Sequence, residues 1–138
     1  MKTKILILGA GFGGLELSTL LSDALGRDAG VTLIDQNDHF MFGFSKLDVL
    51  FGHAEAKAVR MPYKKFVKPG VRFARETITA IDPAGRRVTT NRNTYEAEHL
   101  VVALGASYDI AATPGLAQVN EFYSVAGALK PVGGRMRS

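Results

Sequence analysis

Residues 4–14 read KILILGAGFGG, a short apolar run that passes directly into a glycine-rich turn. Gly9, Gly11 and Gly14 in this turn follow the spacing G-x-G-x-x-G. At this spacing the first glycine permits a tight turn from a strand into a helix, the second lets the backbone approach a diphosphate, and the third lets the helix pack on the strand. The stretch therefore predicts a strand, a phosphate-binding turn and a helix whose positive end faces the phosphates.

The residues that follow complete a β-α-β unit. Residues 12–25 carry leucines close to a three-to-four spacing, which predicts an amphipathic helix packed on a sheet and ended by Gly26. Residues 30–35, GVTLID, predict a second strand parallel to the first. Asp35 ends this strand roughly 20 residues after the glycine turn, where an acid can accept hydrogen bonds from ribose hydroxyls. This context favours a dinucleotide site over a glycine turn that serves packing alone.

The negative charge of Asp35 also favours some dinucleotides over others. A carboxylate at this position repels the 2′-phosphate of NADP, whereas it suits both NAD and the adenosine half of FAD. Glu16, on the first helix, is expected to be a helix-surface residue rather than a ligand.

The next elements predict an antiparallel meander inside a parallel sheet. A third parallel strand is expected at residues 71–73, and three antiparallel strands are joined by PAG and NRN turns: residues 76–82, 87–90 and 94–98. Residues 100–104, LVVAL, form a continuous apolar run that suits a strand buried on both faces. The fold class is therefore α/β, a Rossmann-like three-layer FAD/NAD(P)-binding domain with a parallel sheet and a three-stranded antiparallel meander.

Other segments are less regular. Short helices are expected at residues 45–51 and 61–67, and a short strand at residues 121–125. The aromatic residues between 40 and 44 either pack under a long loop or form a surface for another domain, a subunit or a membrane. We expect one nucleotide-binding domain over residues 1–128 and a frayed tail, or the start of a second domain, over residues 129–138.

Composition narrows the class of protein. The 138 residues allow one ordinary domain, and no apolar run approaches the ~20 residues that cross a bilayer. The net charge of +4 is spread over separate elements without interleaved aromatic residues, so nucleic acid is not expected as a partner. The absence of cysteine excludes disulfide and thiolate chemistry within these residues. The expected location is the cytoplasm, with peripheral contact at the inner face of the membrane as the alternative.

The β-α-β unit, the meander and the VALGA turn at residues 102–106 resemble the N-terminal FAD-binding domain of the FAD-dependent pyridine nucleotide-disulfide oxidoreductase superfamily. Within it, GAGFGGLEL at residues 9–17 and DHFMFGFSKLDVLFG at residues 38–52 are most similar to the sulfide:quinone and type II NADH:quinone oxidoreductase group. The resemblance implies a flavin-dependent oxidoreductase domain that takes part in electron transfer from sulfide or NADH to a quinone, with FAD as its cofactor.

The resemblance also implies the residues that hold FAD. Those that line the pyrophosphate are Gly9, Gly11, Phe12, Gly13 and Gly14. Asp35 and Gln36 face the adenosine ribose, and Thr77 and Ile78 offer backbone groups to the adenine. The residues that close over the cofactor are Ala103, Leu104 and Gly105, and those toward its flavin half are Ser45 and Lys46. For Lys46 an exposed loop lysine is the alternative.

The chain departs from the family in what it does not contain. A second G-x-G-x-x-G, a later flavin-holding G-D motif, a C-terminal interface domain and redox cysteines are all absent from these residues. We therefore expect an N-terminal fragment, inactive alone, whose partners are missing C-terminal domains or a second copy. The alternatives are a non-enzymatic NAD(H)- or ADP-binding module and a folded remnant that binds nothing firmly.

No catalytic residue and no metal site are expected. His39, His53 and His99 lie far apart in the sequence and form neither a catalytic triad nor a metal set. In flavoenzymes the cofactor carries the electron chemistry, so the protein's task is binding and orientation.

Overall fold

The structure is a computed structural model that describes residues 2–119, 121 and 123–130. The chain divides into two units, Met1–Phe40 with Pro62–Ala106 and Met41–Met61 with Ser107–Ser138. The first unit contains the glycine turn and every strand of a parallel sheet.

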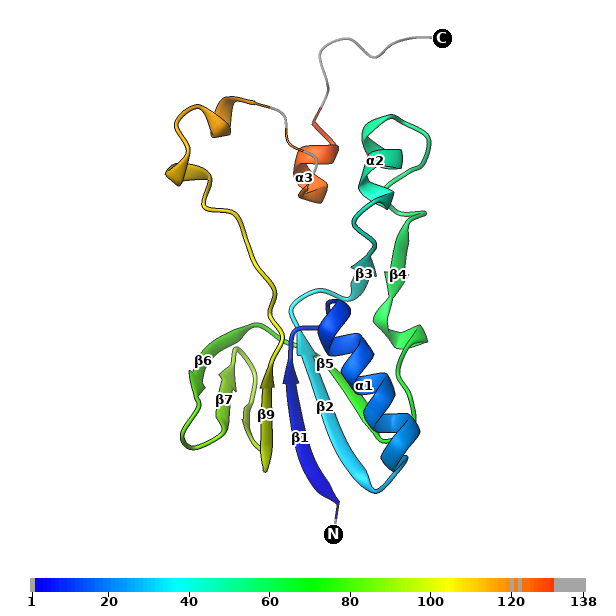
Figure 1. The fold of residues 1–138 in the computed structure, drawn as a ribbon, viewed down its shortest axis with the longest axis vertical. Helices are drawn as coiled ribbons and strands as arrows, with labels where there is room; N and C mark the ends of the chain where they lie inside the picture. Colours follow the sequence, from blue (N-terminus) through cyan, green and yellow to red (C-terminus); the bar gives the residue numbers. More distant parts are fainter. Residues whose placement is uncertain (1, 120, 122, 131–138) are drawn as a thin grey trace. The chain divides into compact units, whose positions relative to one another are not determined.

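Four parallel strands form this sheet in the order β5-β2-β1-β9 (Figure 1). Their bounds are Thr3–Leu8 for β1, Ala29–Asp35 for β2, Val71–Arg75 for β5 and His99–Val102 for β9. Leu8 is in register with Ile34 of β2 and Val102 of β9. The carboxyl ends of these strands therefore reach one edge of the sheet, which is where ligands bind in folds of this kind.

Helix α1 (Phe12–Leu25) covers one face of the sheet and has the predicted bounds. Its buried residues share one side and are small: Gly14, Ser18 and Ser22. The leucine pattern therefore predicts the helix but not its buried side, because Leu20 is 55% and Leu25 is 44% exposed. Small residues let the helix axis lie close to the strands, and partly buried leucines complete the packing: Leu15, Leu17 and Leu21.

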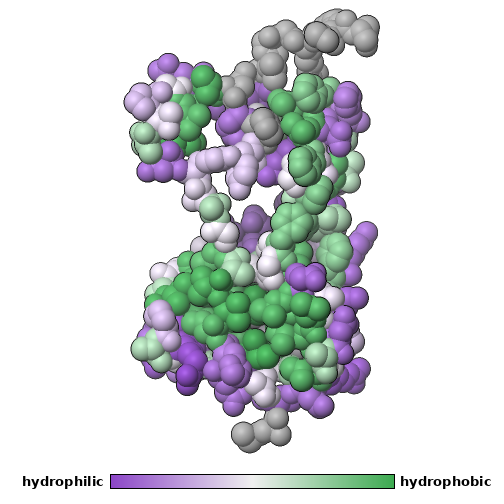
Figure 2. All heavy atoms as spheres, viewed as in Figure 1, coloured by the Kyte–Doolittle hydropathy of each residue, from purple (hydrophilic) through white to green (hydrophobic). Residues whose placement is uncertain are grey.

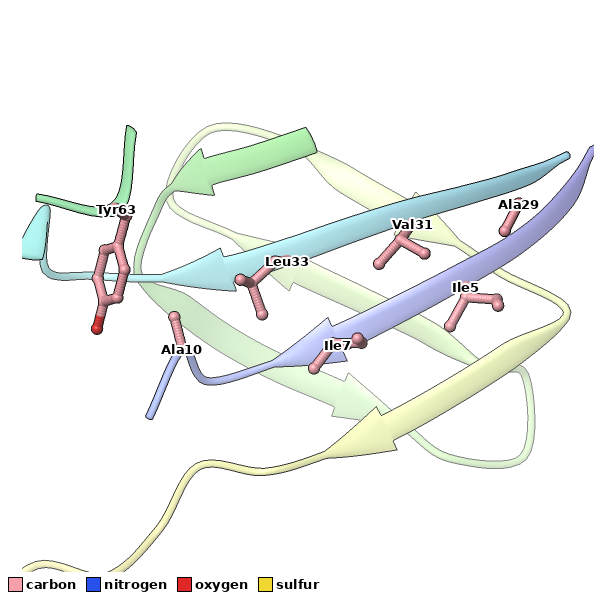
Figure 3. Close-up of a cluster of buried hydrophobic side chains, with 7 residues drawn as sticks. All are labelled: Ile5, Ile7, Ala10, Ala29, Val31, Leu33 and Tyr63. Atoms are coloured by element: carbon pink, nitrogen blue, oxygen red, sulfur yellow. The ribbon is translucent and has the colours of Figure 1, made fainter. Parts of the chain in front are cut away.

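The core on the side of α1 is drawn in Figure 3. Its buried side chains come from β1, β2 and two flanking segments: Ile5, Ile7, Ala10, Ala29, Val31, Leu33 and Tyr63. Tyr63 begins the short helix η1 (Tyr63–Lys65), and its ring centroid lies 4.8 Å from that of Phe73. Burial, with the nearby charge of Asp35, raises the pKa of the Tyr63 hydroxyl. The ring therefore acts as a neutral core residue beneath the end of β2.

The opposite face of the sheet is covered by the meander. β6 (Ile78–Asp82), β7 (Arg87–Thr90) and β8 (Thr94–Glu96) pair antiparallel in a three-stranded sheet. Its fully buried Val88 joins a second core cluster: Leu6, Leu8, Ile34 and Ala74. In Figure 2 apolar residues gather over the middle of the first unit and polar residues surround them. The predicted α/β, Rossmann-like three-layer fold is confirmed.

Two expectations for the first unit are wrong. The strand expected at residues 100–104 ends at Val102 and is not buried on both faces, because β9 is an edge strand of the described sheet. Val102 is 60% and Leu104 is 53% exposed. The helix expected at residues 61–67 is only the turn of η1, preceded by β4 (Arg60–Pro62), which pairs with β3 (His39–Met41).

The second unit contains short helices: α2 (Ser45–Leu50), η2 (Ile110–Ala112), η3 (Leu116–Gln118) and α3 (Val125–Ala128). The strand expected at residues 121–125 is wrong for the part that is described, because Ser124 instead caps α3 and accepts a hydrogen bond from the N–H of Gly127 over 2.9 Å. Most of the expected frayed tail, residues 131–138, lies outside the described residues. The domain bounds of 1–128 and 129–138 stay a prediction.

Candidate dinucleotide site

The glycine turn has the geometry that its sequence predicts. Gly9 has φ +95°, and a Cβ added there would lie 2.4 Å from the carbonyl oxygen of Ala103. A Cβ at Gly14 would lie 1.8 Å from the carbonyl oxygen of Gly9. Both positions therefore exclude a side chain. A Cβ at Gly11, in contrast, meets nothing within 4 Å, so its backbone faces open space where a ligand can approach.

The first turn of α1 begins directly after Gly11, its N-cap residue. The N–H groups of a helix's first turn have no partner within the helix and point out of its positive end. Phe12 stands beside this end, where its ring makes an edge contact with Phe40 at 4.9 Å between centroids. The backbone of the turn thus offers a cradle for a diphosphate.

The turn is held against the loop that follows β9. The N–H of Ala103 donates to the carbonyl of Leu8 over 2.8 Å, and the Leu104 Cα lies 2.9 Å from a Cβ added at Gly9. Gly105 has φ +74°, a left-handed conformation that glycine adopts without strain. The structure therefore brings the predicted residues 103–105 beside the glycine turn.

Asp35 is tied to the same turn. Its Oδ2 accepts from the N–H of Ala10 over 2.8 Å, while its Oδ1 accepts from the backbone N–H and the side-chain amide of Asn37 over 2.8 and 3.0 Å. A carboxylate has about four acceptor positions, two on each oxygen. One position on Oδ2 remains, which is enough for a ribose hydroxyl.

A cavity of about 550 Å³ opens beside Asp35, within the size range of ligand sites. Its lining comes from the turn, the end of β2, the start of the meander and the loop after β9: Gly9, Ile34, Asp35, Gln36, Asn37, Glu76, Thr77, Ile78, Thr79, Ala80, Ile81 and Leu104. The structure thus brings together the residues predicted for the ribose and the adenine. Gln36 also accepts a long hydrogen bond, 3.4 Å, from Nε of Arg75 to its carbonyl.

Thr77 and Ile78, the residues predicted to meet the adenine, also line this cavity. The N–H of Thr77 donates to the side-chain oxygen of Asn91, and its carbonyl accepts from the N–H of Asn91, both over 2.9 Å. Ile78 pairs with Thr90 across β6 and β7. The Thr77 N–H is therefore engaged by Asn91, whereas its carbonyl keeps a second lone pair for a ligand.

Glu76 lines the same cavity, and the sequence patterns do not single it out. It is only 8% exposed, and its carboxylate accepts from Oγ1 of Thr90 at 2.5 Å, from Nδ2 of Asn93 at 2.8 Å and from the hydroxyl of Tyr95 at 2.9 Å. Burial alone would raise the pKa of this carboxyl, but the bonds from Thr90, Tyr95 and Asn93, with the charge of Arg92, lower it. Glu76 is therefore an ionised carboxylate inside the cavity wall.

The residues predicted for the flavin half lie in the second unit. Ser45 and Lys46 begin α2, and Lys46 Nζ donates to the carbonyl of Tyr123 and stands 4.9 Å from the centroid of its ring. The Tyr123 ring in turn contacts Tyr108 at 4.4 Å between centroids. In this structure Lys46 therefore binds within its own unit.

Other kinds of site are not found in the described part of the chain. No group of acids and histidines there could hold a metal ion. No described helix is long and apolar enough to cross a membrane. The arrangement of the glycine turn, Asp35 and the cavity suits the binding of a nucleotide.

Comparisons with known proteins agree with this geometry. The family described as pyridine nucleotide-disulphide oxidoreductase matches residues 3–133. The type II NADH:quinone oxidoreductase of Staphylococcus epidermidis is 35% identical over 106 residues, which cover 75% of this chain and 26% of that protein. The chain therefore spans about a quarter of the length of this curated relative.

Solved structures share the fold. The sulfide:quinone oxidoreductase of Aquifex aeolicus has a TM-score of 0.81 at 23% identity, over 93% of this chain and 30% of that one. NDH2 of Plasmodium falciparum in complex with NADH has a TM-score of 0.75 at 20% identity, over 94% of this chain and 28% of that one. The predicted resemblance is confirmed: this chain belongs to the pyridine nucleotide-disulphide oxidoreductase family.

Proposed function

We propose that the first unit binds FAD through its ADP half. The carrying observation is that Asp35, which lines the 550 Å³ cavity at the carboxyl edge of the sheet, also holds the N–H of Ala10, next to the open backbone face of Gly11. In this arrangement the diphosphate lies on the N–H groups at the start of α1, and the adenosine lies in the cavity.

Each part of the site has a separate task. The glycine turn supplies N–H donors and lets the backbone approach the diphosphate closely. Oδ2 of Asp35 accepts from a ribose hydroxyl while it also accepts from the N–H of Ala10. Leu104 adds an apolar wall. Burial of the adenine against apolar residues of the wall, together with the diphosphate contacts, provides the affinity.

The activity that we propose for the whole protein follows from family membership and the named relatives. FAD, when bound, supplies hydride and electron transfer. A protein of this type transfers electrons from NADH or sulfide to a quinone. We expect the chain alone to bind the cofactor and to be inactive.

A non-enzymatic NAD(H)- or ADP-binding module is the second candidate. The observation that favours it is that the cavity lining contains residues predicted for the ADP moiety, Gly9, Asp35 and Thr77 among them, and this moiety is common to FAD and NAD. The two candidates differ in whether the flavin part of FAD adds to the affinity that the ADP moiety provides.

Calorimetric titration of the purified chain with FAD, ADP and NADH distinguishes them. If the chain is an FAD domain, FAD binds more tightly than NADH and at least as tightly as ADP. A dissociation constant for FAD no lower than that for NADH contradicts the proposal and supports the module. Binding of none of the three ligands contradicts both.

A further inference from the structure

Glu76 connects the two sides of the nucleotide cavity. Its N–H donates to the carbonyl of Asp35 over 3.0 Å, which ties it to the end of β2. Its carboxylate reaches in the other direction, to Thr90 at the end of β7 and to Tyr95 in β8. One residue thus spans from the ribose side of the cavity to the meander.

The donors around Glu76 are fully used. The Thr90 hydroxyl donates to Glu76 Oε2 at 2.5 Å, with the carbonyl of Asn93 at 3.0 Å as a second acceptor for the same proton, and it accepts from the N–H groups of Arg92 and Asn93 over 3.1 and 2.9 Å. Because a hydroxyl has one donor and two acceptor positions, Thr90 has none to spare. The carboxylate of Glu76 accepts from Thr90, Asn93 and Tyr95 at once, which an amide of the same size cannot do.

The next residue along the chain forms the cavity wall. Thr77 is held by Asn91, and Asn91 follows Thr90, so the Glu76 network and the Thr77–Asn91 pair fix the same turn from two sides. Thr77, Ile78 and Thr79 all line the cavity. The position of this wall relative to Asp35 thus depends on the Glu76 carboxylate.

We propose that Glu76 is a positioning residue for the adenosine half of the bound dinucleotide, holding the meander wall at the distance from Asp35 that the adenosine requires. This inference rests on the proposed nucleotide binding and deepens it. Glu76 itself acts through Thr77 and its neighbours, whose backbone and side chains face the cavity.

The Glu76→Gln variant tests this positioning. A glutamine amide directs an N–H₂ toward either the Thr90 oxygen, which already accepts twice, or the Asn93 and Tyr95 donors. The first orientation opposes one donor, the Thr90 hydroxyl, and the second opposes two, so each displaces a partner of residue 76 and moves the wall. We expect the dissociation constant for ADP to rise about tenfold, as for other residues that orient ligand-binding groups. Tyr95→Phe removes one donor only and should raise it by a smaller factor.

Two controls separate positioning from general loss of stability. Val31→Ala creates a cavity in the core on the α1 side, where Val31 is 2% exposed, and lowers the free energy of unfolding without touching the network. Glu98→Gln alters another carboxylate, which accepts from the N–H of Lys4 at the start of β1. Both should bind ADP as the unmodified chain does, at a temperature where circular dichroism shows every variant folded.

The outcomes are distinct. Weaker ADP binding in Glu76→Gln and Tyr95→Phe, with neither control affected, supports the proposal. Unchanged ADP binding in Glu76→Gln and Tyr95→Phe overturns the positioning role but leaves the proposed function intact. The same conclusion follows if Val31→Ala, at an equal loss of stability, loses as much affinity for ADP as Glu76→Gln. Failure of the unmodified chain to bind either ADP or FAD overturns the proposed function, and the positioning role with it.

Discussion

The backbone N–H of Ala10 donates to Oδ2 of Asp35 over 2.8 Å, so the acid that ends β2 holds the glycine turn that follows β1. Asp35 is therefore a structural residue of the turn as well as the proposed acceptor for the ribose. Asp35→Ala is expected to lower the free energy of unfolding by about 1–3 kcal/mol, because it leaves the Ala10 N–H without its acceptor. It should also weaken ADP binding. Urea unfolding and calorimetry measure the two effects.

Asp82→Ala is the matched control for Asp35→Ala. Oδ1 of Asp82 also accepts from a backbone N–H, that of Gly85 over 2.9 Å, but in an exposed turn of the meander. Its loss should cost less stability and leave ADP binding unchanged. Equal ADP binding by Asp35→Ala and the unmodified chain would show that Asp35 serves the turn alone.

Substitution of the glycines should separate binding from folding. Gly11→Ala adds a Cβ into open space, whereas Gly14→Ala drives one into the carbonyl of Gly9. We expect Gly11→Ala to keep its unfolding free energy and lose most of its affinity for ADP, because the methyl group occupies the space of the diphosphate. Gly14→Ala should lose about 3 kcal/mol or more of stability.

Gly43→Ala serves as the control, since a Cβ there also meets nothing within 4 Å and lies in the second unit. It should retain both stability and ADP binding. ADP binding by Gly11→Ala with unchanged affinity would place the diphosphate elsewhere.

Local signals predict the elements of the first unit well. α1 ends where Gly26, with φ +53°, donates its N–H to the carbonyl of Ser22, so a glycine in the sequence marks the boundary directly. The glycine turn and Asp35 are predicted from spacing because each contact joins residues at fixed positions of one β-α-β unit. The fold class and the geometry of the glycine turn can thus be predicted from short stretches of sequence.

Solvent exposure and side-chain networks that depend on contacts between distant segments cannot be predicted from short stretches of sequence. The exposure of Val102 follows from the place of β9 at the sheet edge, which its apolar run does not reveal. Glu76 lies between β5 and β6, Thr90 ends β7 and Tyr95 lies in β8, and only the folding of the meander brings them together. A single acid between two strands has the same local pattern whether it is exposed in a loop or buried in a network.

Stability should fall in acid partly through Glu76. Its carboxyl has a pKa below the ordinary value of 4.5, because the bonds from Thr90, Tyr95 and Asn93 and the charge of Arg92 outweigh the opposing effect of burial. A carboxyl with a lowered pKa in the folded chain adds stability above its unfolded pKa, and this contribution is lost as the pH falls through the folded pKa. The free energy of unfolding should therefore decrease as the pH falls below about 4.5.

Comparison with Glu76→Gln isolates this contribution, since other carboxyls with lowered pKa, such as Asp38 beside His39 and Arg75, titrate in both proteins. Urea unfolding at a series of pH values should show a smaller decrease for Glu76→Gln than for the unmodified chain. Tyr95→Phe removes one of the stabilising hydrogen bonds, so its decrease in unfolding free energy should be intermediate between those of Glu76→Gln and the unmodified chain. Parallel curves for all three proteins would assign the acid sensitivity to other groups.

Lys46 provides the test of the predicted flavin side. Its Nζ donates to the carbonyl of Tyr123, so the amine is held in the second unit while its charge remains available to an anionic or carbonyl group of a ligand. If Lys46 lies toward the flavin half, Lys46→Gln should raise the dissociation constant for FAD about tenfold, the effect of one charge-assisted hydrogen bond, and leave that for ADP unchanged. Lys57→Gln, at an exposed lysine of the same unit, should alter neither constant. Calorimetry of the three proteins with both ligands measures the ratio of the constants directly. An equal change for FAD and ADP in Lys46→Gln would assign Lys46 to the stability of its own unit rather than to the cofactor.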